Sequence, residues 1–321
     1  MAPATRSTVL TATALIAITG EVGAHGLAAE AVHRWTWEPV TVALLVASAA
    51  LYAAGTRAVW RRAGVGRGVR RWQALSFAGG LLSLALALLS PVVWLSTVLF
   101  SVHMTQHEIL MLVAAPLLVF GQPLFAMLWA LPRSGREVWG RWSQTPWVAR
   151  SWGAITGPFT VFVLHALALW IWHTPRLYEA ALHSEAIHAV EHLCFVVTAA
   201  LFWWAMVHGR YGRIGYGIAV LYIFLTAIHS SVLGALMTIS PDVLYTDYVT
   251  TGAPWQVNAL EDQQLAGLLM WVPSGLVFIV FGLALFAAWL GQSDKRVGLG
   301  SVVLPLPPLH LPIREGSDDA A

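Results

Sequence analysis

Residues 97–119 read TVLFSVHMTQHEILMLVAAPLLV. Most of the stretch is apolar, and it is long enough to cross the hydrocarbon core of a membrane as a helix, which takes about 20 residues. Its middle does not suit lipid, because two histidines four residues apart are followed directly by a glutamate: His103, His107 and Glu108. Such groups cost several kcal/mol against lipid, so they should face the inside of a helix bundle.

Six other apolar stretches of similar length accompany this one. The composition agrees with a membrane protein, because 58% of the 321 residues are hydrophobic and only 11% are charged, whereas soluble domains carry about 25% charged residues. We therefore predict an all-α membrane protein whose core, residues 30–292, is a bundle of seven transmembrane helices. The predicted spans are 40–56, 73–91, 97–119, 152–172, 186–207, 215–239 and 264–290.

The two ends of the chain are expected to lie outside this bundle. A short apolar run at 8–24 follows Arg6 and is typical either of a cleaved signal peptide or of an eighth helix. Both interpretations of residues 1–29 stay open. Residues 293–321 are polar, rich in proline and acidic at their end, which favours a disordered cytoplasmic tail.

Positive charge is unevenly divided between the predicted loops, and this predicts the orientation. Every second loop is basic, as the positive-inside rule expects on the cytoplasmic side of a plasma membrane. The core should therefore begin outside the cell and end inside it. Because these clusters are short and flank membrane spans, nucleic-acid binding is not expected. The basic residues are Arg57, Arg61, Arg62, Arg67, Arg70, Arg71, Arg133, Arg136, Arg141, Arg150, Arg210, Arg213, Lys295 and Arg296.

Two pairs of histidines on different predicted helices share one spacing. His103 and His107 form the first pair, and His188 and His192 form the second. The i, i+4 spacing puts two imidazoles on one helix face, which is how a helix presents two ligands to one metal ion. Both pairs fall in the outer halves of their spans, so the sequence predicts a shared site in the outer leaflet.

Further polar residues lie at related depths. His165 and His229 belong to helices that rise towards the outside, and their depths overlap those of the two pairs. Each of them can equally be a hydrogen-bonded packing residue. His173 falls at the outer water boundary. Glu191 follows His188 by three residues, where a carboxylate could orient a metal-binding histidine through its second ring nitrogen.

The ligand types narrow the choice of metal. Imidazole suits zinc, copper, iron and nickel, and a thioether such as that of Met270 shifts the preference towards Cu(I). A single cysteine, Cys194, excludes an intramolecular disulfide and a CxxC site. The HExxH pattern of zinc proteases does not occur. Two other functions stay open: a membrane oxidoreductase that binds haem between facing histidines, and a copper or proton transporter.

Three separated stretches resemble the motifs of the caa3-type CtaG family, bacterial assembly factors of cytochrome c oxidase. The resemblance extends over residues 35–292 and implies a polytopic membrane protein that helps mature haem-copper oxidases and is not itself an enzyme. The stretches are HMTQHEILMLVAAPLLVFGQP (103–123), WIWHTPRLYEAALHSEAIHAVEHLCFVVTAALFWW (170–204) and NALEDQQLAGLLMWVPSG (258–275).

The resemblance also implies a site and partners. Copper would pass from a donor protein on the outer side to the catalytic subunit of the oxidase. Glu108 departs from the family pattern, which has an apolar residue there, and would add a carboxylate. The acidic residues at 261–262 can equally be ordinary N-terminal helix residues that suit the helix dipole. We predict copper ligands at His103, His107, His173, His188, His192 and His229, and surrounding or pocket-mouth residues at Glu108, Glu191, Glu261, Asp262, Gln263 and Met270.

Overall fold

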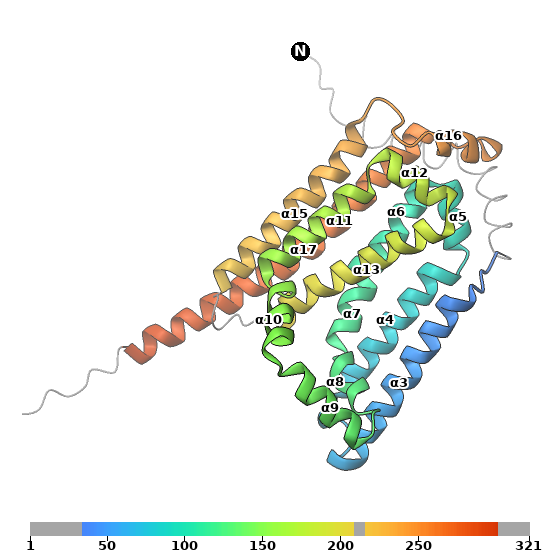
Figure 1. Cartoon of the computed structure of the whole chain (residues 1–321). Helices are drawn as coiled ribbons and strands as arrows, with labels where there is room; N and C mark the ends of the chain where they lie inside the picture. The colour runs from blue at the N-terminus through green and yellow to red at the C-terminus, as the bar shows by residue number, and fades with distance from the viewer. Residues whose placement is uncertain (1–33, 209–215, 301–321) are drawn as a thin grey trace, which may run out of the picture.

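The computed structural model describes residues 34–208 and 216–300, and within these ranges all regular structure is helical (Figure 1). Among the described residues, six helices or groups of helices are long and apolar enough to cross a membrane, and a bent pair adds a seventh crossing. The predicted all-α membrane bundle is therefore confirmed. The crossings are α3 (Pro39–Ala63), α4 (Arg71–Leu89), α6–η1–α7 (Phe100–Glu108, Ile109–Ala114, Ala115–Phe120), α10–α11 (Pro146–Ile155, Pro158–Trp172), α13 (Glu185–His208), α15 (Tyr216–Ile239) and α17 (Ala259–Gly300).

Shorter helices gather at the two ends of the bundle (Figure 1). One end carries α5 (Val92–Val98), α12 (Pro175–His183), α16 (Asp247–Gly252) and η2 (Ala253–Trp255). We call it the histidine end, because the histidine pairs of α6 and α13 lie in the first turns on that side. The other end carries the loop 64–70, α8 (Pro123–Leu128) and α9 (Arg133–Ser143), and we call it the arginine end.

Proline decides where several of these helices begin. Pro158 starts α11, and the residue before it, Gly157, is extended with ψ 137°. A residue before proline avoids the helical region, so the fourth span is broken here, with α10 and α11 at 55° to each other. Pro175 starts α12 in the same way after extended Thr174. The missing N–H of proline costs nothing in a first helical turn.

Glycine allows the closest approach between two spans, α15 and α17. A Cβ atom on Gly234 would lie 2.9 Å from the carbonyl oxygen of Gly267 on the facing helix. Such contacts suit membrane helices, which associate through tight packing of small residues rather than through the hydrophobic effect. The main buried core continues from this contact through Met270 and Phe278 towards α13.

Some sequence-based expectations fall outside the described residues. These are the apolar run within 1–29, the basic residues Arg210 and Arg213, and the tail from 301 onwards. Within the described ranges, α17 continues past the predicted end of the core at residue 292 and ends at Gly300.

Candidate metal centre

The third span changes its helical form directly after the first histidine pair. α6 ends at Glu108, and the next turn, Ile109–Ala114, is a π-helix. A π-turn disturbs the regular ladder of backbone hydrogen bonds and is frequent at functional sites. The indole Nε1 of Trp203 on α13 donates a hydrogen bond of 3.0 Å to the carbonyl oxygen of Met111 in this turn. The irregular turn is thereby fixed to the helix that carries the second histidine pair.

The two histidine pairs face each other across α6 and α13. The Nε2 atoms of His103 and His107 are 3.0 Å apart. The ring centre of His103 lies 5.2 Å from that of His188, and the ring centre of His107 lies 5.3 Å from that of His192. A fifth imidazole, that of His173 at the end of α11, lies 5.9 Å from His107. Five of the six predicted ligands thus form one cluster.

Hydrogen bonds decide which ring nitrogen of His103 is protonated. The hydroxyl of Tyr248 donates its single proton to the carbonyl oxygen of Ser96 at 2.9 Å, because a carbonyl can only accept. Burial raises the pKa of Tyr248 well above its ordinary range, so the hydroxyl keeps that proton. The contact of 3.1 Å between Tyr248 and Nδ1 of His103 must then be an Nδ1–H donor bond. Nε2 of His103 is therefore unprotonated, and its lone pair is directed into the cluster, where it accepts the 3.0 Å hydrogen bond from Nε2–H of His107.

The same reasoning applies to His173. Its Nδ1 lies 2.7 Å from the carbonyl oxygen of Leu169, so Nδ1 carries the proton and donates it. Burial lowers the pKa of His173 to about 4, although this hydrogen bond opposes the shift. The ring is therefore neutral at physiological pH, with Nε2 unprotonated. Metal-binding histidines commonly have this arrangement, in which the second nitrogen donates to a carbonyl or a hydroxyl.

Several polar atoms of the cluster are buried without a hydrogen-bond partner among the described residues. Both carboxylate oxygens of Glu191 belong to this set, and its side chain is 0% exposed. Oε1 of Glu191 lies 3.9 Å from Nε2 of His107, which is too far for a hydrogen bond. Buried carboxylates are normally paired with a cation or hydrogen-bonded. The ring nitrogens in the same condition are Nδ1 of His107 and Nε2 of His173, His188 and His192.

This donor set fits a metal ion. Ligand atoms of His103, His188 and His192 lie within 4.8 Å of one another, and so do those of His103, His107 and Glu191. Nitrogen and oxygen ligands about 2.0–2.2 Å from a tetrahedral ion lie about 3.3–3.6 Å from each other, so side-chain rotations that shift the ligand atoms by about 1 Å close either group around an ion. His103 is common to both groups. His188 is the most exposed of the five histidines.

Asp262 and Gln263 have structural contacts near the cluster rather than inside it. The Asp262 carboxylate accepts a hydrogen bond of 2.6 Å from the backbone N–H of Phe100, and so caps the first turn of α6 from another helix. Gln263 accepts from the N–H of Leu244 at 2.6 Å and thereby fixes the loop that carries Tyr248. Glu261 is exposed and accepts a hydrogen bond from Asn258 at 3.2 Å.

Three other predicted site residues lie apart from both ligand groups. Glu108 has a buried Oε2 without a hydrogen-bond partner in the described ranges, but it belongs to neither group. Met270 is 2% exposed and packs in the main core. His229 has its ring contacts with Phe162 and His165.

Sequence reasoning missed the tyrosines around the cluster. Tyr178 on α12 contacts the hydroxyl of Tyr248 at 2.9 Å, and Tyr245 donates to the carbonyl oxygen of His173 at 2.8 Å. All three tyrosines are buried. Tyr245 and Tyr248 lie in a non-periodic connection between two spans, so no pattern in the sequence marks them. They become recognisable only when the connection is folded back over α6.

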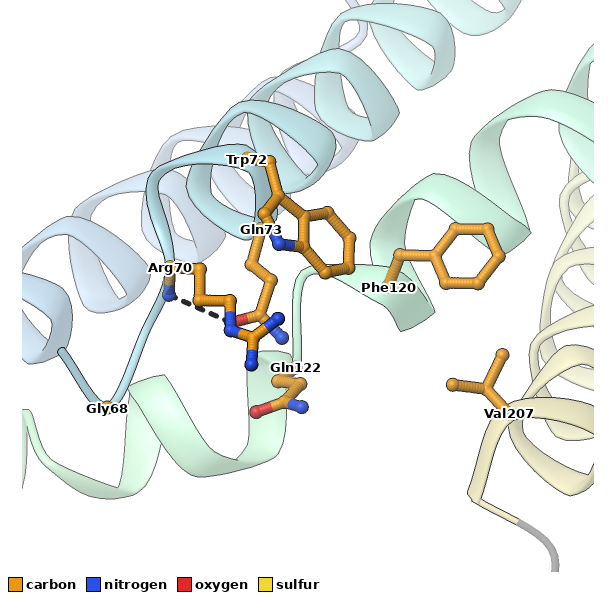
Figure 2. Close-up of a pocket in the computed structure, with 7 residues that line it drawn as sticks. All are labelled: Gly68, Arg70, Trp72, Gln73, Phe120, Gln122 and Val207. Carbon is orange, nitrogen blue, oxygen red and sulfur yellow. Dashed lines mark hydrogen bonds between the residues drawn. The ribbon is translucent and has the colours of Figure 1, made fainter. Parts of the chain in front are cut away.

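A separate surface pocket of about 420 Å³ lies at the opposite end of the bundle. Figure 2 shows Arg70 and Trp72 beside the amides of Gln73 and Gln122, with Val207 of α13 across from them. Gln73 accepts a hydrogen bond of 2.8 Å from the backbone N–H of Arg70. Because Val207 and His188 lie near opposite ends of α13, this pocket is distinct from the histidine cluster.

Comparison with known proteins decides the family. The family described as cytochrome c oxidase caa3 assembly factor, Caa3_CtaG, matches residues 50–292. The chain belongs to this family. The matched range includes all five clustered histidines and Glu191.

Two mycobacterial relatives extend the family comparison. An uncharacterised protein of Mycobacterium bovis is 30% identical over 276 residues, which is 82% of this chain and 40% of the relative. An uncharacterised protein of Mycobacterium leprae is 28% identical over 211 residues, 63% of this chain and 31% of the relative. The chain thus spans about two fifths of the length of the first relative. No solved structure matches it significantly.

Proposed function

We propose that this assembly factor binds copper as Cu(I) at the histidine cluster and passes it to the catalytic subunit of a haem-copper oxidase. His103, His107, His188 and His192 are the primary ligands, and His173 is a further imidazole beside His107. Copper is cargo in this proposal, so the protein performs no catalytic turnover. Family membership supports the role in oxidase assembly, and the histidine cluster supports the binding of a metal ion.

The observation that carries this proposal is the position of Glu191. Its carboxylate is fully buried among imidazoles, and neither oxygen has a hydrogen-bond partner in the parts of the chain that the structure describes. Leaving a carboxyl group buried without a hydrogen-bond partner is costly, whether it is ionised or protonated. A cation bound between Glu191, His103 and His107 offsets that cost. The hydrogen bonds that His103 donates to Tyr248 and His173 donates to Leu169 already fix the orientation of two imidazoles of the cluster.

The choice of copper over zinc rests on the family rather than on the ligand type. Neutral imidazoles suit copper and zinc about equally well by ligand type. Zinc has no place in the catalytic site of a haem-copper oxidase, whereas the family assembles such an oxidase. Metal analysis of the purified protein distinguishes the two ions directly.

We further propose that the histidine end faces the outside of the cell. The arginine end carries Arg67, Arg70, Arg133, Arg136 and Arg141, which the positive-inside rule assigns to the cytoplasm. A donor protein on the outer side would then deliver copper near His188, the most exposed histidine of the cluster.

The proposal is tested with His107→Ala in a strain that depends on this protein for its oxidase. The variant should reach normal levels in the membrane, while the oxidase lacks its catalytic copper and its activity at limiting copper falls by at least tenfold. His183→Ala is the matched control, because His183 is an exposed histidine that contacts Asp247 and belongs to neither ligand group. Normal oxidase activity in the His107→Ala strain at limiting copper overturns the proposed role.

A further inference from the structure

His165 and His229 lie next to each other between three spans, apart from the metal centre described above. His165 is on α11 and is 5% exposed, and His229 is on α15. Their ring centres are 6.5 Å apart. His165 precedes His173 by eight residues, so the pair lies about 12 Å deeper in the bundle than the end of α11. Phe162 and Phe202 pack against the two rings.

The proton positions around His165 resemble those at His103. The hydroxyl of Thr198 on α13 donates to the carbonyl oxygen of Cys194 at 2.8 Å, because the carbonyl can only accept. The contact of 3.2 Å between Thr198 and Nδ1 of His165 is therefore donated by the ring. Nε2 of His165 is then unprotonated, and the oriented lone pair has the same origin as in a metal-binding histidine.

His229 supplies the second unusual feature of this pair. Both of its ring nitrogens are buried, and neither has a hydrogen-bond partner within residues 34–208 and 216–300. Each unpaired polar group in the membrane interior costs about 1–3 kcal/mol. A packing histidine would be expected to donate to a neighbouring backbone or hydroxyl oxygen, as His165 does. His229 instead has a histidine as its neighbour.

The spacing of the two rings fits an ion between them. A direct hydrogen bond would bring the ring nitrogens to about 3 Å. Two metal–nitrogen bonds of about 2 Å in line separate the nitrogens by about 4 Å. A ring nitrogen lies about 1 Å from its ring centre. When a nitrogen of each ring faces the other ring, ring centres 6.5 Å apart therefore correspond to the wider spacing rather than the narrower one.

We infer that His165 and His229 form a second copper site, which holds Cu(I) between two imidazoles at a deeper level of the bundle. Within the described residues, neither histidine belongs to a group of three or more histidine, cysteine or acidic side chains that could share an ion. Zinc takes four ligands in structural sites, so a pair of neutral ligands favours a monovalent soft ion. The inference rests on the proposed function for the choice of copper.

The test compares Cu(I) stoichiometry in the full-length protein, purified in lipid nanodiscs without oxygen and titrated against a Cu(I) chelator. The variant His165→Ala/His229→Ala should bind one copper per chain fewer than the wild type. The variant His103→Ala/His107→Ala should keep that one copper, and X-ray absorption should show it bound by two nitrogens. His183→Ala, which removes an exposed imidazole, should bind as the wild type does.

The outcomes separate this inference from the proposed function. Equal copper binding by the wild type and His165→Ala/His229→Ala overturns the second site and leaves the main centre intact. Loss of copper in that variant, with none lost in His103→Ala/His107→Ala, supports the second site and overturns the main centre. Binding of no copper by the wild type overturns both. The double variant could lose copper because it misfolds, so Thr198→Val is a second test. It keeps both rings, removes the acceptor for Nδ1–H of His165, and should reduce the copper affinity of the second site about tenfold.

Discussion

Asp262 of α17 accepts a hydrogen bond of 2.6 Å from the backbone N–H of Phe100, one turn before His103. A residue in the first turn of α17 thereby caps the first turn of α6. Asp262 thus has a structural role towards another helix, whereas its neighbour Glu261 is exposed. The cap fixes the end of α6 from which both His103 and His107 project.

Replacing Asp262 by alanine should therefore affect both stability and copper binding. Loss of a helix cap costs about 0.5–2 kcal/mol, and α6 would begin to fray beside His103. We expect a lower temperature of thermal unfolding in detergent and a Cu(I) affinity reduced several-fold. Asp262→Asn is the control, because an amide oxygen can still accept from Phe100. An alanine variant with the affinity of the wild type would show that the cap does not position the ligands.

Tyr248→Phe tests the hydroxyl that fixes the tautomer of His103. The change removes the acceptor for Nδ1–H and leaves the carbonyl oxygen of Ser96 without its donor. Loss of an outer-shell partner typically reduces metal affinity by about 10–100-fold, so we expect a reduction of that size in a Cu(I) competition titration. The free energy of unfolding should fall by about 1–3 kcal/mol.

Tyr245→Phe is the matched control for this change. Its hydroxyl is equally buried, but it donates to the backbone oxygen of His173 and contacts no ring nitrogen. It should lose similar stability and keep its copper affinity within a few-fold of the wild type. Equal loss of affinity in both variants would mean that packing of the tyrosines, rather than the tautomer, governs binding.

Glu191→Gln tests whether copper binding needs a carboxylate at this position. The amide is almost the same size as the carboxyl group but cannot ionise, so it cannot balance the charge of a bound cation. We expect the metal-free variant to unfold at the same temperature as the wild type or higher, and its Cu(I) affinity to fall at least tenfold. Glu179→Gln is the control, since Glu179 contacts Thr246 in an exposed loop. Unchanged copper affinity in Glu191→Gln would remove Glu191 from the site.

The sequence predicted the spans closely because length and hydropathy are local properties. The third span begins at Phe100 rather than at residue 97, because Leu99 is extended and the residues before it form the separate helix α5. The i, i+4 spacing also predicted that each histidine pair shares a helix face. Depth along a span says little about rotation around its axis, and for that reason His229 could not be assigned to His165 from the sequence.

The residues that orient the ligands could not be predicted from the sequence, for a different reason. Tyr248 and Asp262 act across sequence separations of 145 and 162 residues, respectively. Such contacts depend on how the connection between α15 and α17 folds over α6. Neither residue type has a spacing that would distinguish this role from ordinary packing or capping.

Gly267→Ala and Gly275→Ala, two substitutions on α17, should have opposite effects on stability. A Cβ atom on Gly267 would lie 2.5 Å from the carbonyl oxygen of Gly234, so α15 and α17 must move apart, at a cost of about 1–3 kcal/mol. A Cβ atom on Gly275 would meet nothing within 4 Å, and alanine there should stabilise the helix by about 0.5–1 kcal/mol. Thermal unfolding of both variants in the same detergent measures the difference. Equal unfolding temperatures would show that the two spans do not depend on close glycine contact.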